Sequence, residues 1–218
     1  MSEKAVTPSL SWRLEAWFND ISPEHYAKLK GFNAMLHKNN RTLNLVSSKT
    51  LPLSDVLHFS DSILAMRLLF DDNKNIDHLY DLASGSGFPG LIGAVLFPKI
   101  KFSLVEVDAK KCEFLKACVD ELKLSNVSVI NSTIESLPAN SVKYSVTRGF
   151  GNISKMILVA RKCVPTGGTL YHMRGEQWGL EVSQIPTQLC SVWTPSLIKE
   201  YKLPIGEIRF ALLKTDKN

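Results

Sequence analysis

The chain has 218 residues, of which 44% are hydrophobic and 22% are charged. These values argue against a largely disordered chain, and the length suits one well-cored domain with room for a small extension. The 26 Lys and Arg residues outnumber the 21 Asp and Glu residues, so the net charge is +5. That excess is compatible with a polyanionic partner but does not require one.

The sequence predicts neither a membrane anchor nor a metal site. Its longest apolar stretches are too short to cross a bilayer, and MSEKAVTPSL lacks the basic and apolar regions of a signal peptide. We therefore expect a cytoplasmic protein. The cysteines are scattered, without a CxxC pair or a histidine at metal-ligand spacing, and are interpreted as small core residues: Cys112, Cys118, Cys163 and Cys190.

Residues 1–75 are expected to form a helical N-terminal extension. Apolar residues recur at helical spacing in SWRLEAWF and again over residues 23–37, where Ser22 is the expected N-cap. Asn39 and Asn40 break this second pattern. Ser54 is a candidate N-cap for the helix that follows.

Residues 76–218 are expected to form an α/β core. Short apolar runs such as HLYDLA, KFSLVEV and YSVTRGF alternate with helical patterns such as KKCEFLKACVDELKL and ISKMILVARKCV. This alternation predicts βαβ units and a mostly parallel sheet with helices on both faces. The tail LIKEYKLPIGEIRFALLK predicts an antiparallel hairpin at the sheet edge, and we expect the extension and the core to pack as one compact unit.

The stretch DLASGSGFPG places Gly85, Gly87 and Gly90 between a predicted strand and a predicted helix. Glycine there would let the backbone approach a ligand at the carboxyl edge of the sheet, and the letters from Gly85 match G-x-G-x-x-G. Asp81, in the strand before the loop, would repel a pyrophosphate but suit the sulfonium and amino groups of S-adenosylmethionine. The motif therefore favours a methyltransferase over a dehydrogenase.

The next predicted strand ends near two acids, Glu106 and Asp108, about twenty positions after the glycine turn. An acid at this strand tip can accept hydrogen bonds from the ribose hydroxyls of a nucleoside cofactor. Both residues qualify by position. Asp108 is better placed to be the N-cap of the following helix.

Several motifs in order resemble those of the bacterial small-subunit ribosomal RNA guanine-N7 methyltransferases, a family also called glucose-inhibited division protein B. The resemblance runs from about Asn44 to Lys214: NLVSS resembles the family's NLTS, DLASGSGFPG its DxGxGxGxPG, and VTRGF its SRAF, while HMRG stands where the family has LKG. It implies a Rossmann-like class I S-adenosylmethionine-dependent methyltransferase. The expected reaction is methyl transfer to N7 of a guanine in 16S ribosomal RNA.

The resemblance also implies the roles of individual residues. The expected cofactor contacts are Asp81, Ser84, Gly85, Gly87, Phe88, Glu106, Ile134, Glu135 and Arg148. Arg148 is also the expected catalytic residue beside the target guanine. The expected RNA contacts are Asn44, His58, Arg148 and Arg174, within a wider set of basic candidates that includes Lys155.

Two of these residues have a second interpretation. Phe88 could be a packed turn residue instead of part of a ligand pocket. His58 could be a buried histidine held by Asp61 or Ser62, which the sequence alone favours over an RNA contact.

Three positions depart from the family's pattern. Ala83 replaces the usual first glycine, which could move the loop slightly away from the cofactor, and Thr133 and Arg174 replace an arginine and a lysine.

The resemblance implies that the partner is 16S ribosomal RNA or the small ribosomal subunit. We expect no membrane partner and no metal, and we expect the protein to be a monomer. Three alternatives stay open: an oxidoreductase that binds NAD, a non-catalytic RNA-binding relative, and a methyltransferase of another RNA.

Overall fold

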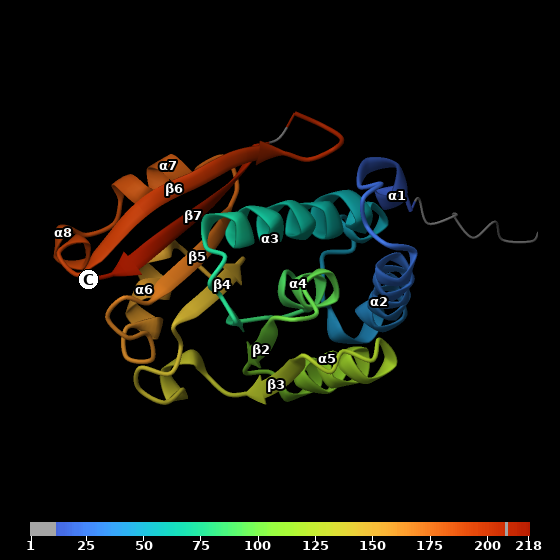
Figure 1. The fold of residues 1–218 in the computed structure, drawn as a ribbon, viewed down its shortest axis with the longest axis horizontal. Helices are drawn as coiled ribbons and strands as arrows, with labels where there is room; N and C mark the ends of the chain where they lie inside the picture. The colour runs from blue at the N-terminus through green and yellow to red at the C-terminus, as the bar shows by residue number, and fades with distance from the viewer. Residues whose placement is uncertain (1–11, 208) are drawn as a thin grey trace, which may run out of the picture.

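The computed structural model describes residues 12–207 and 209–218, and their strands form one mixed sheet (Figure 1). The strand order is β3-β2-β1-β4-β5-β7-β6. Strands β1 to β5 pair in parallel and β7 runs antiparallel to both β5 and β6. Their bounds are β1 His78–Leu82, β2 Lys101–Glu106, β3 Val127–Asn131, β4 Tyr144–Arg148, β5 Thr169–Arg174, β6 Trp193–Lys202 and β7 Arg209–Lys217.

The helices alternate with the parallel strands and cover the sheet on both sides (Figure 1). Their bounds are α1 Leu14–Trp17, α2 Pro23–Leu43, α3 Asp61–Asp72, α4 Gly90–Leu96, α5 Ala109–Glu121, α6 Ile153–Ala160, α7 Trp178–Ser183 and α8 Thr187–Cys190. Two 3-10 turns, η1 Leu51–Leu53 and η3 Ile134–Ser136, and a π-helical turn, η2 Asp55–Ser60, complete the set. The α/β fold, the sheet and the closing hairpin are as the sequence predicted.

Two apolar cores lie against the sheet. One joins the N-terminal helices to it, because Leu29 and Phe32 of α2 belong to the same cluster of buried side chains as Leu104 of β2 and Leu115 of α5. The other packs α6 against the sheet and includes Trp193 of β6. The N-terminal helices and the α/β core therefore share one hydrophobic interior.

Three expectations about local structure were wrong. Helix α2 continues through Asn39 and Asn40, because the Asn40 side chain hydrogen-bonds both the N–H and the carbonyl of Val46 and so ties the helix end to the next segment. The Ser54 hydroxyl caps no helix and donates to Asn33 instead. Cys190 is exposed, and the sequence analysis did not anticipate the short helices α7 and α8.

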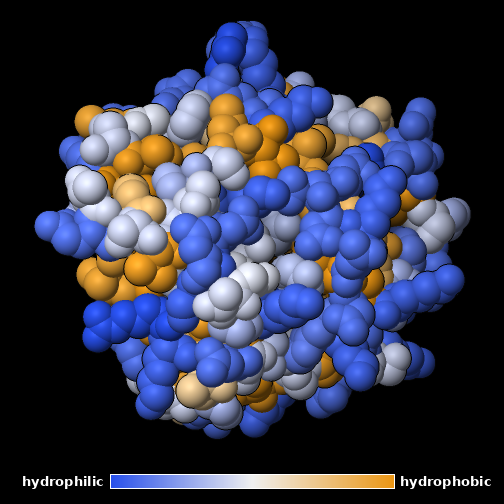
Figure 2. All heavy atoms as spheres, turned by 60° about the vertical axis from the view of Figure 1, so that its left-hand side comes forward, coloured by the Kyte–Doolittle hydropathy of each residue, from blue (hydrophilic) through white to orange (hydrophobic). Residues whose placement is uncertain are grey.

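None of the helices in the described part of the chain combines the length and the apolar character needed to cross a bilayer. Across residues 12–207 and 209–218, no three His, Cys, Asp or Glu side chains gather in a way that could hold a metal ion. The apolar side chains on the face shown in Figure 2 form several separate groups between hydrophilic ones.

Candidate active site

The strand order reverses between β1 and β4, and the glycine loop follows β1 at this point. Ligands of open α/β sheets bind outside the carboxyl ends of the strands at such a reversal. The Gly85 N–H donates to Glu106 Oε2 at 2.8 Å, and the Asp108 N–H donates to Glu106 Oε1 at 2.9 Å. Glu106 at the tip of β2 therefore fixes the loop after β1. Each of its oxygens retains a lone pair for a further donor.

The glycines of the loop serve different purposes. Gly85 has φ +55° and a Cβ added there would meet no atom closer than 3.9 Å, so this backbone is open on the ligand side. A Cβ on Gly87 would lie 2.5 Å from Leu91, and one on Gly90 would lie 2.6 Å from Asp81 Oδ2. Gly87 and Gly90 are therefore needed for packing inside the protein, which the sequence could not distinguish from approach to a ligand.

Asp81 lies completely buried beneath the loop. Its Oδ2 accepts the Gly90 N–H at 2.9 Å, while its Oδ1 has no hydrogen-bond partner among the described residues. Burial raises the pKa of Asp81 to about 7, although the bond from Gly90 opposes the rise. Ser84 is buried as well, and its hydroxyl donates to the Asp81 carbonyl. Both side chains thus hold the loop from inside.

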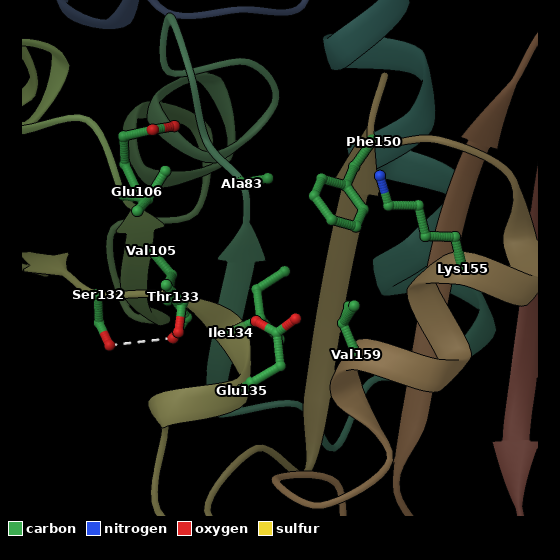
Figure 3. A pocket seen from close by; sticks show the side chains of 11 residues that line it. Ala83, Val105, Glu106, Ser132, Thr133, Ile134, Glu135, Phe150, Lys155 and Val159 are labelled. Carbon is green, nitrogen blue, oxygen red and sulfur yellow. Dashed lines mark hydrogen bonds between the residues drawn. The ribbon is translucent and has the colours of Figure 1, made fainter.

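A cavity of about 290 Å³ opens beside Glu106, between the ends of β1 and β2, the turn η3 and helix α6 (Figure 3). Its lining is mainly apolar and consists of Ala83, Val105, Glu106, Val107, Ser132, Thr133, Ile134, Glu135, Phe150, Lys155 and Val159. An acid at one end of an apolar slot suits a nucleoside, because the acid can bind the ribose while the slot encloses the flat base.

Three of the predicted cofactor residues meet in this cavity: Glu106, Ile134 and Glu135. Phe150 and Lys155 also line it, and neither was predicted as a cofactor contact. Lys155 lies with its Nζ 5.1 Å from the centre of the Phe150 ring. Phe150 follows VTR at the end of β4, so its closeness to that strand tip was the signal available in the sequence.

Arg148, at the tip of β4, lies outside this cavity and is held by residues from the N-terminal helices. Its Nη2 donates to the Leu57 carbonyl at 3.1 Å and to His58 Nδ1, and its Nε lies 3.4 Å from Asp61 Oδ2. Its Nη1 has no partner among the described residues. One edge of the guanidinium is therefore fixed by the protein and the other is available.

His58 is neutral in this arrangement. A guanidinium can only donate, so His58 Nδ1 must accept and the proton of the ring must be on Nε2, which lies 3.1 Å from Thr50 Oγ1. Burial and the charge of Arg148 lower the pKa of His58 to about 3. The expectation of a buried histidine is confirmed, but its partners are Arg148 and Thr50, not Asp61 or Ser62.

A second cavity, of about 240 Å³, lies on the other side of Arg148 at the ends of β4 and β5. Arg174 borders it, with only 6% of its side chain exposed, and donates through Nη1 to the Gly151 carbonyl at 2.7 Å. The two predicted RNA contacts Arg148 and Arg174 thus meet at one opening.

Residues 25–199 match the family model described as rRNA small subunit methyltransferase G. The chain belongs to this family. It is 54% identical over 216 residues to ribosomal RNA small subunit methyltransferase G 3 of Bdellovibrio bacteriovorus, which covers 99% of this chain and 98% of the relative. The corresponding protein of Syntrophomonas wolfei is 33% identical over 165 residues, or 74% of this chain and 76% of the relative.

The fold is shared with other methyltransferases of low sequence identity. A predicted O-methyltransferase of Agrobacterium tumefaciens superposes with a TM-score of 0.55 at 19% identity, over 72% of this chain and 80% of that one. A SAM-dependent methyltransferase of Aquifex aeolicus gives a TM-score of 0.53 at 15% identity, over 69% of this chain and 88% of that one. These structures show that the chain has the class I methyltransferase fold. Its family match makes it a methyltransferase, and both the fold and the S-adenosylmethionine-dependent class are as the sequence predicted.

The first cavity fits the cofactor of the methyltransferase G family. Glu106 offers acceptors for ribose hydroxyls, and the mainly apolar walls can enclose the base. Asp81 does not line this cavity; its Oδ1 is buried beneath the loop and has no partner among the described residues. Phe88 does not line the cavity: it is 5% exposed, and its ring lies 5.0 Å from the ring of Phe32 and 5.1 Å from that of Phe59. Asn44 is an exposed residue in the left-handed conformation that ends α2.

Proposed function

We propose that this protein transfers a methyl group from S-adenosylmethionine to N7 of a guanine in 16S ribosomal RNA. The observation that carries the proposal is that two openings meet at the tip of β4: an apolar cavity bordered by Glu106 on one side, and a cavity bordered by the half-buried Arg148 and the buried Arg174 on the other. Family membership supports the same substrate. The cofactor would supply an electrophilic methyl group, and the chain would bind and orient the two reactants.

In this proposal, Glu106 binds the ribose, while Ile134 and Glu135 border the base of the cofactor. The turn η3 presents these last two residues to the cavity, and Thr133 begins that turn by accepting the Ser136 N–H. The open backbone of Gly85 lies next to Glu106, so the methionine part would follow the loop. Asp81 and Ser84 act from beneath by holding the loop in place.

Arg148 is proposed to orient the target guanine. Guanine N7 has a free lone pair and carries no proton, so its attack on a methyl group needs no general base. His58 is not suited to be one, because its Nδ1 is occupied by Arg148 and its pKa is lowered to about 3. The free Nη1 of Arg148 can donate to guanine O6 and leave N7 unblocked.

The proposal is tested by incubating the protein with tritiated S-adenosylmethionine and small ribosomal subunits from a strain that lacks this gene. Label should enter the 16S RNA with wild-type protein and fall at least about a hundredfold with Arg148→Ala. Arg67→Ala, in α3, is the control and should retain activity, because Arg67 pairs with Asp20 and lines neither cavity. Absence of label from RNA with the wild type, while S-adenosylhomocysteine still binds, would favour a non-catalytic relative. Binding of NADH instead would favour the oxidoreductase.

A further inference from the structure

Four buried side-chain atoms without a hydrogen-bond partner among the described residues gather at the second cavity. Three are donors, Arg148 Nη1, Arg174 Nε and Arg174 Nη2, and one is an acceptor, Glu181 Oε2. Arg174 Nε and Glu181 Oε2 face each other as an ion pair at 3.6 Å, which is too long for a hydrogen bond. A buried polar group without a partner is costly, so such groups are normally satisfied. Their gathering at one opening points to a ligand that accepts and donates hydrogen bonds at once.

The walls of the cavity differ from those of a simple phosphate site. Each arginine already faces a carboxylate, Arg148 with Asp61 at 3.4 Å and Arg174 with Glu181 at 3.6 Å, so the opening offers little net positive charge to a phosphate. Met173 and Phe210 supply apolar surface beside these polar groups. The volume of about 240 Å³ lies below the roughly 300 Å³ of the smallest drug-sized pockets, which suits a single flat base.

We propose that the second cavity is the pocket for the target guanine and that Glu181 determines its specificity by accepting the N1–H and N2–H₂ donors of that base. Arg174 and Arg148 supply donors for O6. This inference rests on the proposed function and adds the residue that selects the base. N7 lies on the other edge of guanine from N1 and N2, so the contact with Glu181 leaves the nucleophile free.

Adenine would be mismatched both with the arginine donors and with the carboxylate of Glu181. Its exocyclic amine would face the arginine donors where guanine has O6, and its N1 lone pair would face the carboxylate. A site built to hydrogen-bond one partner strongly rejects an analogue that leaves its buried polar groups unpaired. Helix α7, which the sequence analysis did not anticipate, carries Glu181 to within 3.6 Å of Arg174 Nε.

The structure positions Arg174 for this role. The Gly151 carbonyl accepts from its Nη1 and fixes the side chain, which leaves Nε and Nη2 at the cavity. Burial lowers the pKa of Arg174, while the carboxylate of Glu181 raises it. The two donors that Gly151 does not use, Nε and Nη2, are therefore the ones placed to donate to guanine O6.

The test is a double-mutant cycle between Glu181 and the N2 amine. Small subunits are reconstituted with RNA in which the guanosine that becomes methylated is either kept or replaced by inosine, which lacks only this amine. We expect Glu181→Gln to lower kcat/KM on guanosine RNA by about tenfold or more. We expect the wild-type protein to show a similar loss of kcat/KM when inosine replaces guanosine. In Glu181→Gln, inosine should cost no more than about a further twofold, because the partner of the amine is already lost.

Glu121→Gln, an exposed glutamate at the end of α5, is the matched control and should behave as the wild type on both RNAs. Two results would overturn the inference: inosine methylated by the wild type as fast as guanosine, or losses from Glu181→Gln and inosine that multiply. The wild-type comparison holds even if Glu181→Gln fails to fold. Methylation of guanosine RNA with no effect of inosine would leave the proposed function intact and reject the pocket alone.

Discussion

At the scale of single residues, the strand pattern predicted that Glu106 lies at the tip of β2, because a strand tip is fixed by the strand that precedes it. Ile134 and Glu135 were predicted only from the family resemblance, and they line the same cavity as Glu106. The cofactor contacts of all three residues stay predictions. The sequence did not reveal that Asp81 and Ser84 support the loop from inside, since that depends on two contacts made on folding: the Gly90 N–H with Asp81 Oδ2, and the Ser84 hydroxyl with the Asp81 carbonyl. It also could not show that Phe88 packs among aromatic rings from α2 and η2.

Replacing Glu106 by Gln should weaken S-adenosylhomocysteine binding by about tenfold or more. The two oxygens of Glu106 each accept one backbone N–H, from Gly85 and from Asp108. A glutamine amide has only one oxygen, so it cannot accept both of these hydrogen bonds and also bind the ribose as a carboxylate does. Calorimetric titration measures the effect. Asp108→Asn is the control: Asp108 caps α5 through the Lys110 N–H, and Asn caps equally well, so its affinity should stay within about twofold. Equal losses in both variants would contradict the role given to Glu106.

Ala83→Gly should stabilise the protein by about 0.5–1 kcal/mol, because Ala83 has φ +62° and only glycine adopts this conformation without a steric cost. Urea unfolding measures the change in the free energy of unfolding. Asn140→Gly, at φ +58° in another loop, should stabilise less, since Asn tolerates the left-handed region better than Ala. Destabilisation by Ala83→Gly would show that the methyl group contributes packing instead of strain.

At the scale of elements, the sequence predicted the βαβ core because buried parallel strands and amphipathic helices have distinct periods. It did not predict how the N-terminal elements attach. The π-helical turn η2 presents His58 to Arg148, and Arg13 forms a paired contact with Asp55 at the start of that turn, at 2.8 and 2.9 Å. These contacts join residues 42 or more positions apart, which no local pattern encodes.

Strand β6 takes part in the same arrangement through Tyr201, whose hydroxyl donates to Asp61 Oδ1 at 2.6 Å. Tyr201→Phe should destabilise the fold by about 1–3 kcal/mol, because it leaves the buried Asp61 oxygen without this donor. It should also lower methyl transfer by about tenfold, since Asp61 holds the Nε edge of Arg148. Denaturation and single-turnover methylation measure the two effects.

Tyr144→Phe in β4 is the matched control, because its hydroxyl forms no hydrogen bond with the described residues and it lies at the opposite end of the strand from Arg148. It should change stability and rate little. Full activity of Tyr201→Phe in spite of lower stability would show that β6 supports the fold without positioning Arg148.

At the scale of the whole molecule, the buried histidines make stability depend on pH. Burial, and then the charge of Arg174, lower the pKa of His172 to about 3, against 6.5 for an exposed histidine. Between these values the unfolded chain binds more protons, so the stability contributed by neutral His172 is complete above pH 6.5 and is lost as the pH falls toward 3. Asp81 acts in the opposite direction, because its raised pKa of about 7 favours the folded state at lower pH.

The variant His172→Gln separates the contribution of His172 to the pH dependence of stability from the contribution of Asp81. Between pH 7 and pH 5 the free energy of unfolding should fall by about 2 kcal/mol more in the wild type than in this variant. Urea unfolding at both pH values measures the difference, with His25→Gln near the start of α2 as the control. Parallel pH profiles for His172→Gln and the wild type would contradict the assignment.

The most direct test of the central claim is the chemical identity of the methylated nucleoside. Small subunits treated with the protein and labelled S-adenosylmethionine are digested to nucleosides, which are separated and identified by mass spectrometry, and the position is mapped on the RNA. We predict 7-methylguanosine at one position of 16S ribosomal RNA. A label on a carbon atom, on an exocyclic amine or on another nucleoside would contradict the claim.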